Sequence, residues 1–477
     1  MTECNQRSFE FQGLGKRKVT ADFSGGYLSS DGGGLILREA ELKMGLIERL
    51  ERCFNDYRHP AFIEHQLEEL LRQRIMGLAL GYEDLNDHDR LRLDPVHAVL
   101  AGKVDVTGEK RVHAEDRGRA LAAHWTLNRM ELGADHLDGR YKKIEACPEQ
   151  IEALLIEEGV KAIPRRSREI VLDFDATDDP LHGQQEGAYF HGYYRAYCYL
   201  PLYCFCGSIP LWAQLRDCKR DGSEGTVEAL KKIVPVIRAR FGRKVRIIVR
   251  ADSGFAREEI VAWCERNKLH YCLGLARNNR LAEHLAKPFS DLHEAIEANQ
   301  VQVPCRRFVE FTYRTLKSWS RKRRVVGKAE VLAKGDNPRY VVTNLPKKGF
   351  PADRAGRFEA AGLYEKFYCQ RGDMENRVKE EQMDLFADRT STHWMASNQL
   401  RLWFSAFAHL ILSVLRAEVL QGTQLARATV GQIRLQLFKI GARIKVSCRR
   451  VHFELVSAYP WQGLFAKAHR QIVERSP

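Results

Sequence analysis

Two apolar runs of the chain end in carboxylates. Residues 170–174 are mostly apolar and β-branched, which is typical of a buried strand, and Asp175 follows them. Residues 245–251 form a second run of this kind, which Asp252 follows. Between the two runs the pattern predicts a helix around residues 224–240, and a strand–helix–strand unit closes right-handed with parallel strands. We therefore expect both carboxylates at one edge of a sheet, where α/β sheets usually hold their sites.

The acids that end the first run allow more than one interpretation. A buried carboxylate is costly without a partner, and a divalent cation is one such partner. Alternatively, Asp178 and Asp179 only begin a turn before Pro180. Asp173 lies on the same strand face as Asp175, because side chains alternate along a strand. Spacing alone does not choose between Asp173 and Asp175.

A third stretch, Tyr368–Gln382, supplies another acid. At helical spacing Tyr368, Arg371 and Glu375 share one face. A glutamate among cations that reaches toward two aspartates would complete a carboxylate site for two hard cations.

These stretches resemble the DDE transposases of bacterial insertion sequences, within the IS4-like superfamily and most closely the IS1380 group. The resemblance covers roughly residues 10–465. The matching segments are Asp175–Thr177, His182–Gly187, Ala251–Phe255 and a Tyr-x2-Arg-x3-Glu signature at Tyr368, Arg371 and Glu375. The match on Asp-x-Thr selects Asp175 rather than Asp173.

The resemblance implies an α/β fold with a ribonuclease H-like catalytic domain. The predicted order β, β, β, α, β, α, β, followed by a later helix with Glu375, is that of this fold. We expect the catalytic domain at 161–276 and 350–384, interrupted by a β-rich insertion at 277–349. A mostly helical N-terminal DNA-binding region at 1–160 and a helical C-terminal region at 385–477 complete the predicted division.

The resemblance also implies a chemistry. Asp175, Asp252 and Glu375 would hold two Mg²⁺ ions, with Mn²⁺ as the substitute, to cut transposon ends and join them to target DNA by cut-and-paste transposition. The partners would be double-stranded DNA, as terminal inverted repeats and target, and a second copy of the chain in a homodimer. The expected location is the cytoplasm of a bacterium, in association with the nucleoid, and no membrane is expected.

Further DNA contacts follow from the signature residues. Tyr368 and Arg371 would grip phosphate near the scissile bond. The signature's later Lys falls at position 382, where this chain has Gln382, and Lys379, one turn after Glu375, is the candidate replacement.

The predicted insertion carries an aromatic residue among cations. Trp319 would stack on a base flipped out of the DNA, with Arg321 and Arg323 beside it. The alternative is that Trp319 is buried in a small sheet and that the cations belong to a solvated hairpin.

Composition agrees with an acidic partner. The net charge of +14 and the pI of about 9.2 favour a polyanion, although a basic enzyme that meets no nucleic acid has the same balance. The twelve Cys lack a Cys-x2-Cys pattern, so a zinc site is not expected. We expect reduced thiols in a cytosolic protein. The N-terminus lacks a signal peptide, and residues 404–415 are apolar but too short to span a bilayer.

Two segments of the N-terminal region compete for a role. The acids of residues 82–89, with Asp94, are a rival metal site, and the alternative is helix caps and turns. Arg117, Arg119 and the predicted helix at 124–129 are candidates for contact with transposon-end DNA, and a plain surface helix is the alternative. Two other functions stay open: a ribonuclease H-like nuclease that cuts without joining, and a domesticated DNA-binding protein without catalysis.

Overall fold

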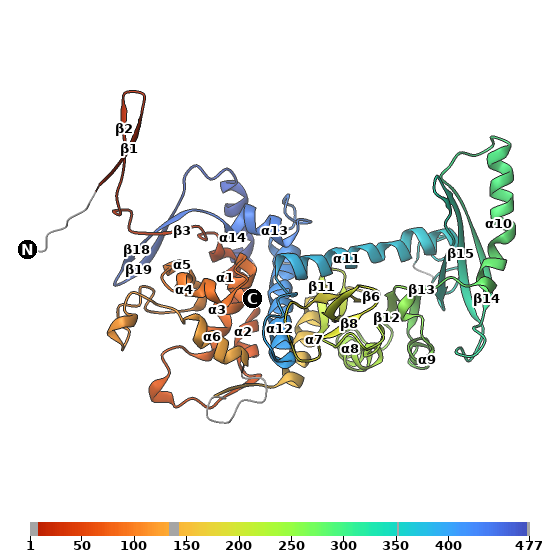
Figure 1. Ribbon diagram of the computed structural model, residues 1–477, viewed down its shortest axis with the longest axis horizontal. Coiled ribbons are helices and arrows are strands. Elements are labelled where there is room, and N and C mark those ends of the chain that lie inside the picture. The colour runs from red at the N-terminus through yellow and green to blue at the C-terminus, as the bar shows by residue number, and fades with distance from the viewer. Residues whose placement is uncertain (1–7, 133–142, 351–352, 475–477) are drawn as a thin grey trace, which may run out of the picture. The chain divides into compact units, whose positions relative to one another are not determined.

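The computed structural model describes residues 8–132, 143–350 and 353–474. Contacts group the chain into two compact units (Figure 1). The first unit combines Met1–Ala146 with Val414–Pro477, and the second unit is Cys147–Ser413. Most of the predicted N-terminal region therefore packs with the last part of the predicted C-terminal region. The four boundaries predicted from the sequence stay predictions.

The second unit is built on a large mixed sheet. Its strands are β6 Glu169–Ala176, β10 Leu202–Cys206, β11 Ile209–Gln214, β12 Arg246–Ala251, β13 His270–Leu275, β14 Cys305–Tyr313, β15 Arg323–Leu332, β16 Gly335–Asp336 and β17 Arg339–Thr343. They are hydrogen-bonded in the order β11-β10-β6-β12-β13-β17-β15-β14, with β16 beside β15. β12 is parallel to β6 and β13, and the other neighbours are antiparallel.

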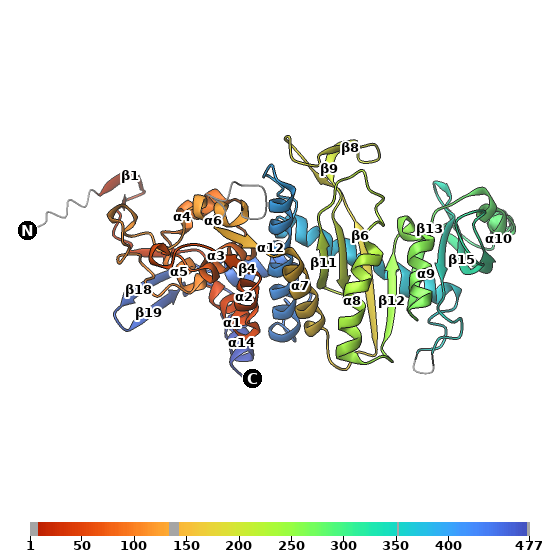
Figure 2. The ribbon, with the colours of Figure 1, turned by 90° about the horizontal axis from the view of Figure 1, so that it is seen from below.

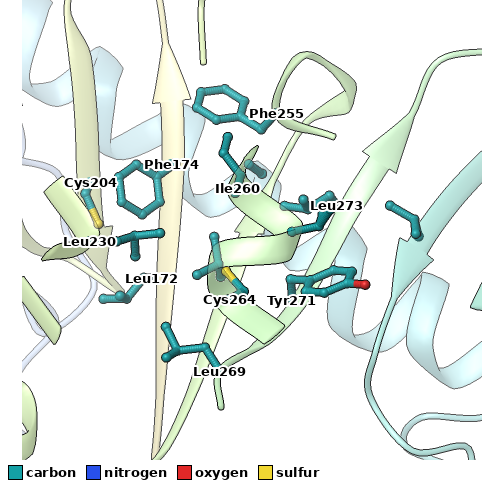
Figure 3. Packing of buried hydrophobic residues seen from close by; sticks show 14 of the residues in the cluster. Leu172, Phe174, Cys204, Leu230, Phe255, Ile260, Cys264, Leu269, Tyr271 and Leu273 are labelled. Carbon is teal, nitrogen blue, oxygen red and sulfur yellow. The ribbon is translucent and has the colours of Figure 1, made fainter. Parts of the chain in front are cut away.

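One face of this sheet packs on helices. The helices are α7 Pro148–Ala162, α8 Thr226–Phe241 and α9 Glu258–Arg266, and Figure 2 shows them along the same side of the strands. Alternation along β6 turns Ile170, Leu172 and Phe174 toward them, and all three are buried. Figure 3 shows Leu172 and Phe174 beside Leu230 of α8. Alternation therefore leaves Asp173 and Asp175 for the opposite face.

The opposite face is covered by a helical segment that follows the last strand. Its elements are η6 Gly362–Phe367, η7 Tyr368–Arg371, α11 Gly372–Lys379 and η8 Glu380–Asp384, and α12 Met395–Val414 follows. Leu363 and Phe367 of η6 pack with Ile248 of β12 and Cys272 of β13 in a second buried cluster. Because side chains alternate along a strand, Arg250 and Asp252 lie on the same face as Ile248.

The stretch predicted as a β-rich insertion differs from that expectation in two ways. It begins with a helix, α10 Asn279–Glu297, which buries Leu281, Leu285 and Leu292. Its strands β14, β15 and β17 do not form a sheet of their own, because β17 pairs with β13 and so extends the sheet that carries the acids.

The second unit also has a small three-stranded sheet. Its strands, β7 Asp179–Pro180, β8 Tyr189–His191 and β9 Ala196–Tyr199, pair in the order β7-β9-β8. This sheet begins four residues after Asp175.

The first unit is mostly helical around a buried polar centre. Its helices are α1 Gly34–Met44, α2 Leu46–Glu51, α3 Leu67–Leu80, α4 His88–Leu91, α5 Pro95–Ala101, α6 His124–Glu131, α13 Val430–Ile433 and α14 Gln462–Glu474, with the short turns η1 Pro60–Phe62, η2 Leu85–Asp87, η3 Ala114–Asp116, η9 Leu415–Val419 and η10 Arg434–Phe438. The buried Asp31 accepts hydrogen bonds from Tyr82 and Lys439 and contacts His97.

Strands of the first unit qualify the expectation of a helical C-terminal region. They are β1 Phe9–Leu14, β2 Arg17–Ala21, β3 Tyr27–Ser29, β4 Phe54–Asp56, β5 Ile144–Ala146, β18 Ala442–Ser447 and β19 Arg450–Leu455. The last two pair with each other and β18 pairs with β3, so the end of the chain adds strands to the beginning.

One apolar helix is longer than the sequence analysis expected. α12 continues through η9, and Met395–Val419 has the length and the apolar composition of a membrane span. However, 83% of its most apolar window is buried inside the structure, as in a core helix.

Candidate active site

Asp175 and Asp252 end neighbouring parallel strands. The register of β6 and β12 pairs Phe174 with Ala251, so the next position on each strand is one of the two aspartates. Both belong to the sheet face that η6, η7 and α11 cover. The register therefore confirms the prediction that Asp175 and Asp252 lie at the same edge of the sheet.

Arg371 connects the acid of β6 with the acid of α11. Its Nη1 lies 3.4 Å from Oδ2 of Asp175, and its Nη2 donates to Oε1 of Glu375 at 2.7 Å. Glu375 is half exposed, whereas Asp175 is largely buried. Arg371 and Glu375, which come late in the sequence of the second unit, thus lie beside Asp175.

The electrostatic balance at Asp175 is unfavourable to its charge. Burial, together with the nearby carboxylates of Asp252 and Glu375, raises the pKa of Asp175 to about 6, although Arg371 lowers it. Burial opposes the charge of Arg371, but the carboxylates of Asp175 and Glu375 raise its pKa overall. Three acids therefore share one guanidinium, and their mutual repulsion is only partly relieved.

The donor set suits hard divalent cations, because carboxylate oxygens are their preferred ligands. Among the described residues, no group of three His, Cys, Asp or Glu side chains is arranged to hold a metal ion as the side chains stand. The Arg371 guanidinium instead contacts oxygens of Asp175 and Glu375. The three carboxylates fit a divalent cation in chemistry and charge.

Asp173 has a different set of contacts. Nε and Nη2 of Arg250 donate to its two carboxylate oxygens at 2.5 and 2.8 Å, and Nη1 of Arg250 donates to the carbonyl of Phe367 at 2.6 Å. Both charged side chains are buried. Asp173 therefore joins β6 to β12 and to η6, which agrees with choosing Asp175 as the site acid.

Tyr368 lies directly over a glycine of β13. A Cβ built on Gly274 would fall 2.5 Å from the Tyr368 hydroxyl and 2.8 Å from the backbone nitrogen of Ser253. Any larger residue at 274 would push Tyr368 or the segment after Asp252 away. Burial raises the pKa of Tyr368 to about 12, with a contribution from Asp252. Sequence reasoning missed Gly274, and no pattern around it gave a signal.

Gln382 occupies the position of the signature's later Lys. Its Nε2 donates to the backbone carbonyl of Asp178 at 3.1 Å, which ties η8 to the segment after Asp175. Lys379 is exposed on α11. Its proposed contact with DNA stays a prediction.

The motif at His182–Gly187 fastens this side of the unit to the start of α12. Gln185 donates to the carbonyl of Thr390 at 3.0 Å, and Glu186 accepts from the backbone nitrogen of Met395 at 3.1 Å. A carboxylate at a helix N-terminus is favourable because it satisfies free N–H groups there. The motif thus has a structural role next to the acids.

Comparison with known proteins gives the family. Residues 11–477 match the model of the transposase DDE domain, group 1. The chain belongs to that family of transposases. No curated protein matches the chain. A solved structure, the piggyBac transposase in a synaptic complex with hairpin DNA, aligns over 86% of this chain and 79% of that chain at 9% identity with a TM-score of 0.40, a likeness too low to assign a fold or a function.

Trp319 of this transposase-family chain is part of the core. Its side chain is 4% exposed, and its ring meets Tyr313 edge to face at a centroid distance of 5.9 Å. This burial agrees with the structural alternative considered for Trp319. A base could stack on this ring only if the side chain left the core.

The two arginines beside Trp319 have different surroundings. Arg323 is buried and donates to Glu258 at 2.7 Å and Glu265 at 2.9 Å, and these bonds raise its pKa although burial opposes its charge. Its charge is therefore used inside the protein. Arg321 is 60% exposed and pairs with Glu265 at 2.8 Å, so it can also reach a phosphate.

The rival acidic cluster of the N-terminal region consists of caps, as its alternative interpretation predicted. Asp84 accepts from Asn86 at the start of η2, and Asp87 accepts from the backbone of Asp84. Asp94 caps α5, and Asp89 contacts the ring of His124 at 2.6 Å.

The neighbouring helix α6 begins at His124, as the pattern predicted. Its contact with DNA stays a prediction, as does that of Arg117 and Arg119.

Proposed function

We propose that this chain is a DNA transposase that cuts transposon ends and joins them to target DNA. The observation that carries the proposal is the meeting of Asp175, Asp252 and Glu375 on one sheet face around Arg371. Membership of a DDE transposase family supports it. The finer assignment, a cut-and-paste enzyme of the IS1380 group, rests on the motifs quoted above.

A ribonuclease H-like catalytic domain is part of this proposal. The strand order β11-β10-β6-β12-β13 combines an antiparallel meander with two parallel strands, and α8 and α9 connect the parallel ones. Under this proposal β14, β15 and β17 belong to the insertion and widen the catalytic sheet.

The three acids would hold two divalent cations, Mg²⁺ in the first place. When bound, such ions activate an attacking oxygen and neutralise the charge that develops on the phosphate. Asp175 must give up its proton to serve as a ligand, and its raised pKa makes this step depend on pH. Arg371, if released from the carboxylates, would pair with the scissile phosphate through its planar fork of donors. Tyr368, whose hydroxyl lies over Gly274, would donate a hydrogen bond to a phosphate of the same strand of DNA.

The partners follow from the same chemistry. Double-stranded DNA would bind as transposon end and as target, helped by the net charge of +14. A homodimer would pair two ends, and the reaction would take place on DNA in the bacterial cytoplasm.

A coupled cleavage and strand-transfer assay tests the proposal. The full chain is incubated with labelled DNA carrying the element's own ends, with Mg²⁺, Mn²⁺ or EDTA. We expect metal-dependent cleavage and joined products, both lost in Asp252→Asn and Glu375→Gln. Cleavage without joining would reassign the chain to the nucleases. DNA binding without cleavage would reassign it to DNA-binding proteins that have lost catalysis.

A further inference from the structure

The β8–β9 hairpin concentrates the exposed aromatic side chains of the second unit. Among the described residues of that unit, the large aromatic side chains on the surface are Tyr189 (37% exposed), Phe190 (59%), Tyr193 (84%) and Tyr197 (57%). An exposed aromatic ring keeps apolar surface in water, which is unfavourable. Four such rings in one short hairpin indicate a surface that meets a partner.

The register of the hairpin gives these rings a common direction. Phe190 pairs with Tyr197 across the strands, and their ring centroids are 5.7 Å apart. The adjacent pair, Tyr189 and Cys198, belongs to the other face, where Cys198 is buried. Phe190 and Tyr197 therefore form one outward-facing aromatic surface, and Tyr193 extends it at the turn. In Figure 2 the hairpin projects from the main sheet.

The buried side of the hairpin, including Tyr194 of its turn, lies next to the segment that follows Asp175. Tyr194 and Ala176 pack against the same buried cluster of Cys198, Leu200 and Cys218, and Ala176 directly follows Asp175. Strand β9 also pairs with β7, which begins at Asp179.

Cations accompany the rings. Arg195 is exposed in the turn that joins β8 and β9, and Lys219 lies on the other face of the hairpin, with its Nζ 3.4 Å from the ring centroid of Tyr189. Exposed rings with a cation nearby suit unpaired nucleotides, because bases stack on the rings and a phosphate pairs with the cation.

We propose that the β8–β9 hairpin is a stacking platform for unpaired bases of the DNA end that lies in the active site. The inference rests on the proposed function and deepens it. It assigns to Phe190, Tyr193 and Tyr197 the base contact that the sequence suggested for Trp319, whose ring is in the core. The hairpin offers a surface beside the acids, and it needs no core residue to move.

Equilibrium DNA binding by the full chain tests this platform, without Mg²⁺ so that no cleavage occurs. The probes are a blunt duplex and the same duplex with unpaired thymines at one end. The test variant is the double substitution Phe190→Ala with Tyr197→Ala, and Tyr193→Ala is measured separately. Because the replaced side chains are exposed, the melting temperature should not change.

The double variant should bind the duplex with the unpaired end roughly tenfold or more weakly than the wild type, as expected for lost base stacking. Binding of the blunt duplex should change by less than about threefold. Phe190→Tyr with Tyr197→Phe keeps both rings and should bind as the wild type does. Leu316→Ala, at another exposed apolar position of the unit, should leave both affinities unchanged.

Several results would overturn the proposal. Equal weakening of both probes, or no weakening of either, removes the platform. Loss of a dimer in analytical ultracentrifugation, with both affinities unchanged, assigns the rings to a second copy of the chain instead. If the wild type binds neither probe, the proposed transposase function fails as well. If it binds both and the variants match it, only the platform fails.

Discussion

Asp31 in the first unit and Asp175 in the second are both withdrawn from water, but their neighbours differ. Asp31 is bonded at 2.6 Å by Tyr82, at 2.8 Å by His97 and at 2.7 Å by Lys439. Asp175 has Arg371 at 3.4 Å and two further acids close by. The first carboxylate has all its partners inside the protein, and the second does not.

The pKa values express this difference. Burial opposes the charge of Asp31, yet the bonds from His97, Lys439 and Tyr82 lower its pKa to about 2. For Asp175, burial and the neighbouring acids raise the pKa to about 6 in spite of Arg371. A carboxylate that stabilises the fold, such as Asp31, has its hydrogen-bond donors within the protein itself. A carboxylate short of positive charge costs stability, which a ligand of opposite charge recovers.

The largest effect is expected from a substitution at Asp175, because its lack of positively charged partners belongs to its proposed role in the site. Under the proposed function, Asp175→Asn should abolish metal-dependent DNA cleavage, because it removes a carboxylate proposed to hold the metal, while it leaves DNA binding and the melting temperature near their wild-type values. Single-turnover cleavage and a melting curve on the same preparation measure both. Asp291→Asn, at a surface aspartate paired with Arg307, is the matched control and should stay active.

Asp173→Asn is not a suitable control for that experiment, because it leaves the buried Arg250 without its carboxylate. It should lower stability by about 3–5 kcal/mol. An Asp175→Asn variant that cleaves normally would contradict the assignment of the site.

Asp31→Ala should have the opposite profile. It leaves Lys439 and His97 without their shared acid, and we expect a loss of about 3–5 kcal/mol in the free energy of unfolding at neutral pH. Because the folded pKa of about 2 lies below the unfolded value of 3.8, the stabilisation is present above pH 3.8 and is lost as the pH falls toward 2. Urea unfolding of both proteins across that range measures it. A constant difference at every pH would mean that packing, and not charge, explains the loss.

A second acid without enough partners lies deeper in the second unit. Glu381 is fully buried, and burial, with a contribution from Glu380, raises its pKa to about 8, although His409 contacts it at 3.1 Å. The folded chain holds this proton up to about pH 8 and the unfolded chain releases it near 4.5, so stability falls as the pH rises between them.

Glu381→Gln should remove that slope and stabilise the protein by about 1–3 kcal/mol near pH 8. Unfolding curves at several pH values provide the measurement, and Glu157→Gln is a control on the surface of α7. Destabilisation by Glu381→Gln at every pH would show that the charged form is the one that the fold requires.

The smallest effect on stability is expected for a charge already in water. Arg321→Ala breaks an exposed pair with Glu265 and should change the free energy of unfolding by less than about 1 kcal/mol. If Arg321 contacts a phosphate, the slope of log affinity for DNA against log salt should decrease by roughly 1. Arg307→Ala, similarly exposed and paired, is the control. An unchanged slope in Arg321→Ala would remove this residue from the DNA-binding set.

Local patterns were sufficient to predict the strands that carry the acids. The runs before Asp175 and Asp252 became β6 and β12, and the helix expected at residues 224–240 became α8, Thr226–Phe241. These signals are short-range, because apolar periodicity and an acid at a strand end can be read within one window. The choice of Asp175 over Asp173 needed the family motif, and the contact of Asp173 with Arg250 agrees with it.

Long-range pairing decided the features that the sequence could not give. Trp319 and Arg323 look like a basic aromatic surface in the sequence, but Tyr313, Glu258 and Glu265 take them into the core. In the sequence Gly274 looks like an ordinary strand residue, and only the folded structure shows that the Tyr368 hydroxyl lies directly over it. The contacts of Arg323 with Glu258 and Glu265 and of Gly274 with Tyr368 join residues far apart in the chain, and no local pattern encodes them.

The pairing of β17 with β13 has a consequence for the order in which parts of this chain fold. The segment with Glu375 follows β17 in the chain, so it can cover the sheet only after a long stretch has been ordered. Closing long loops is entropically costly and slow, and we expect Glu375 to join the two aspartates late in folding. Under the proposed function, a nascent chain would then complete its set of three acids among the last steps of its folding.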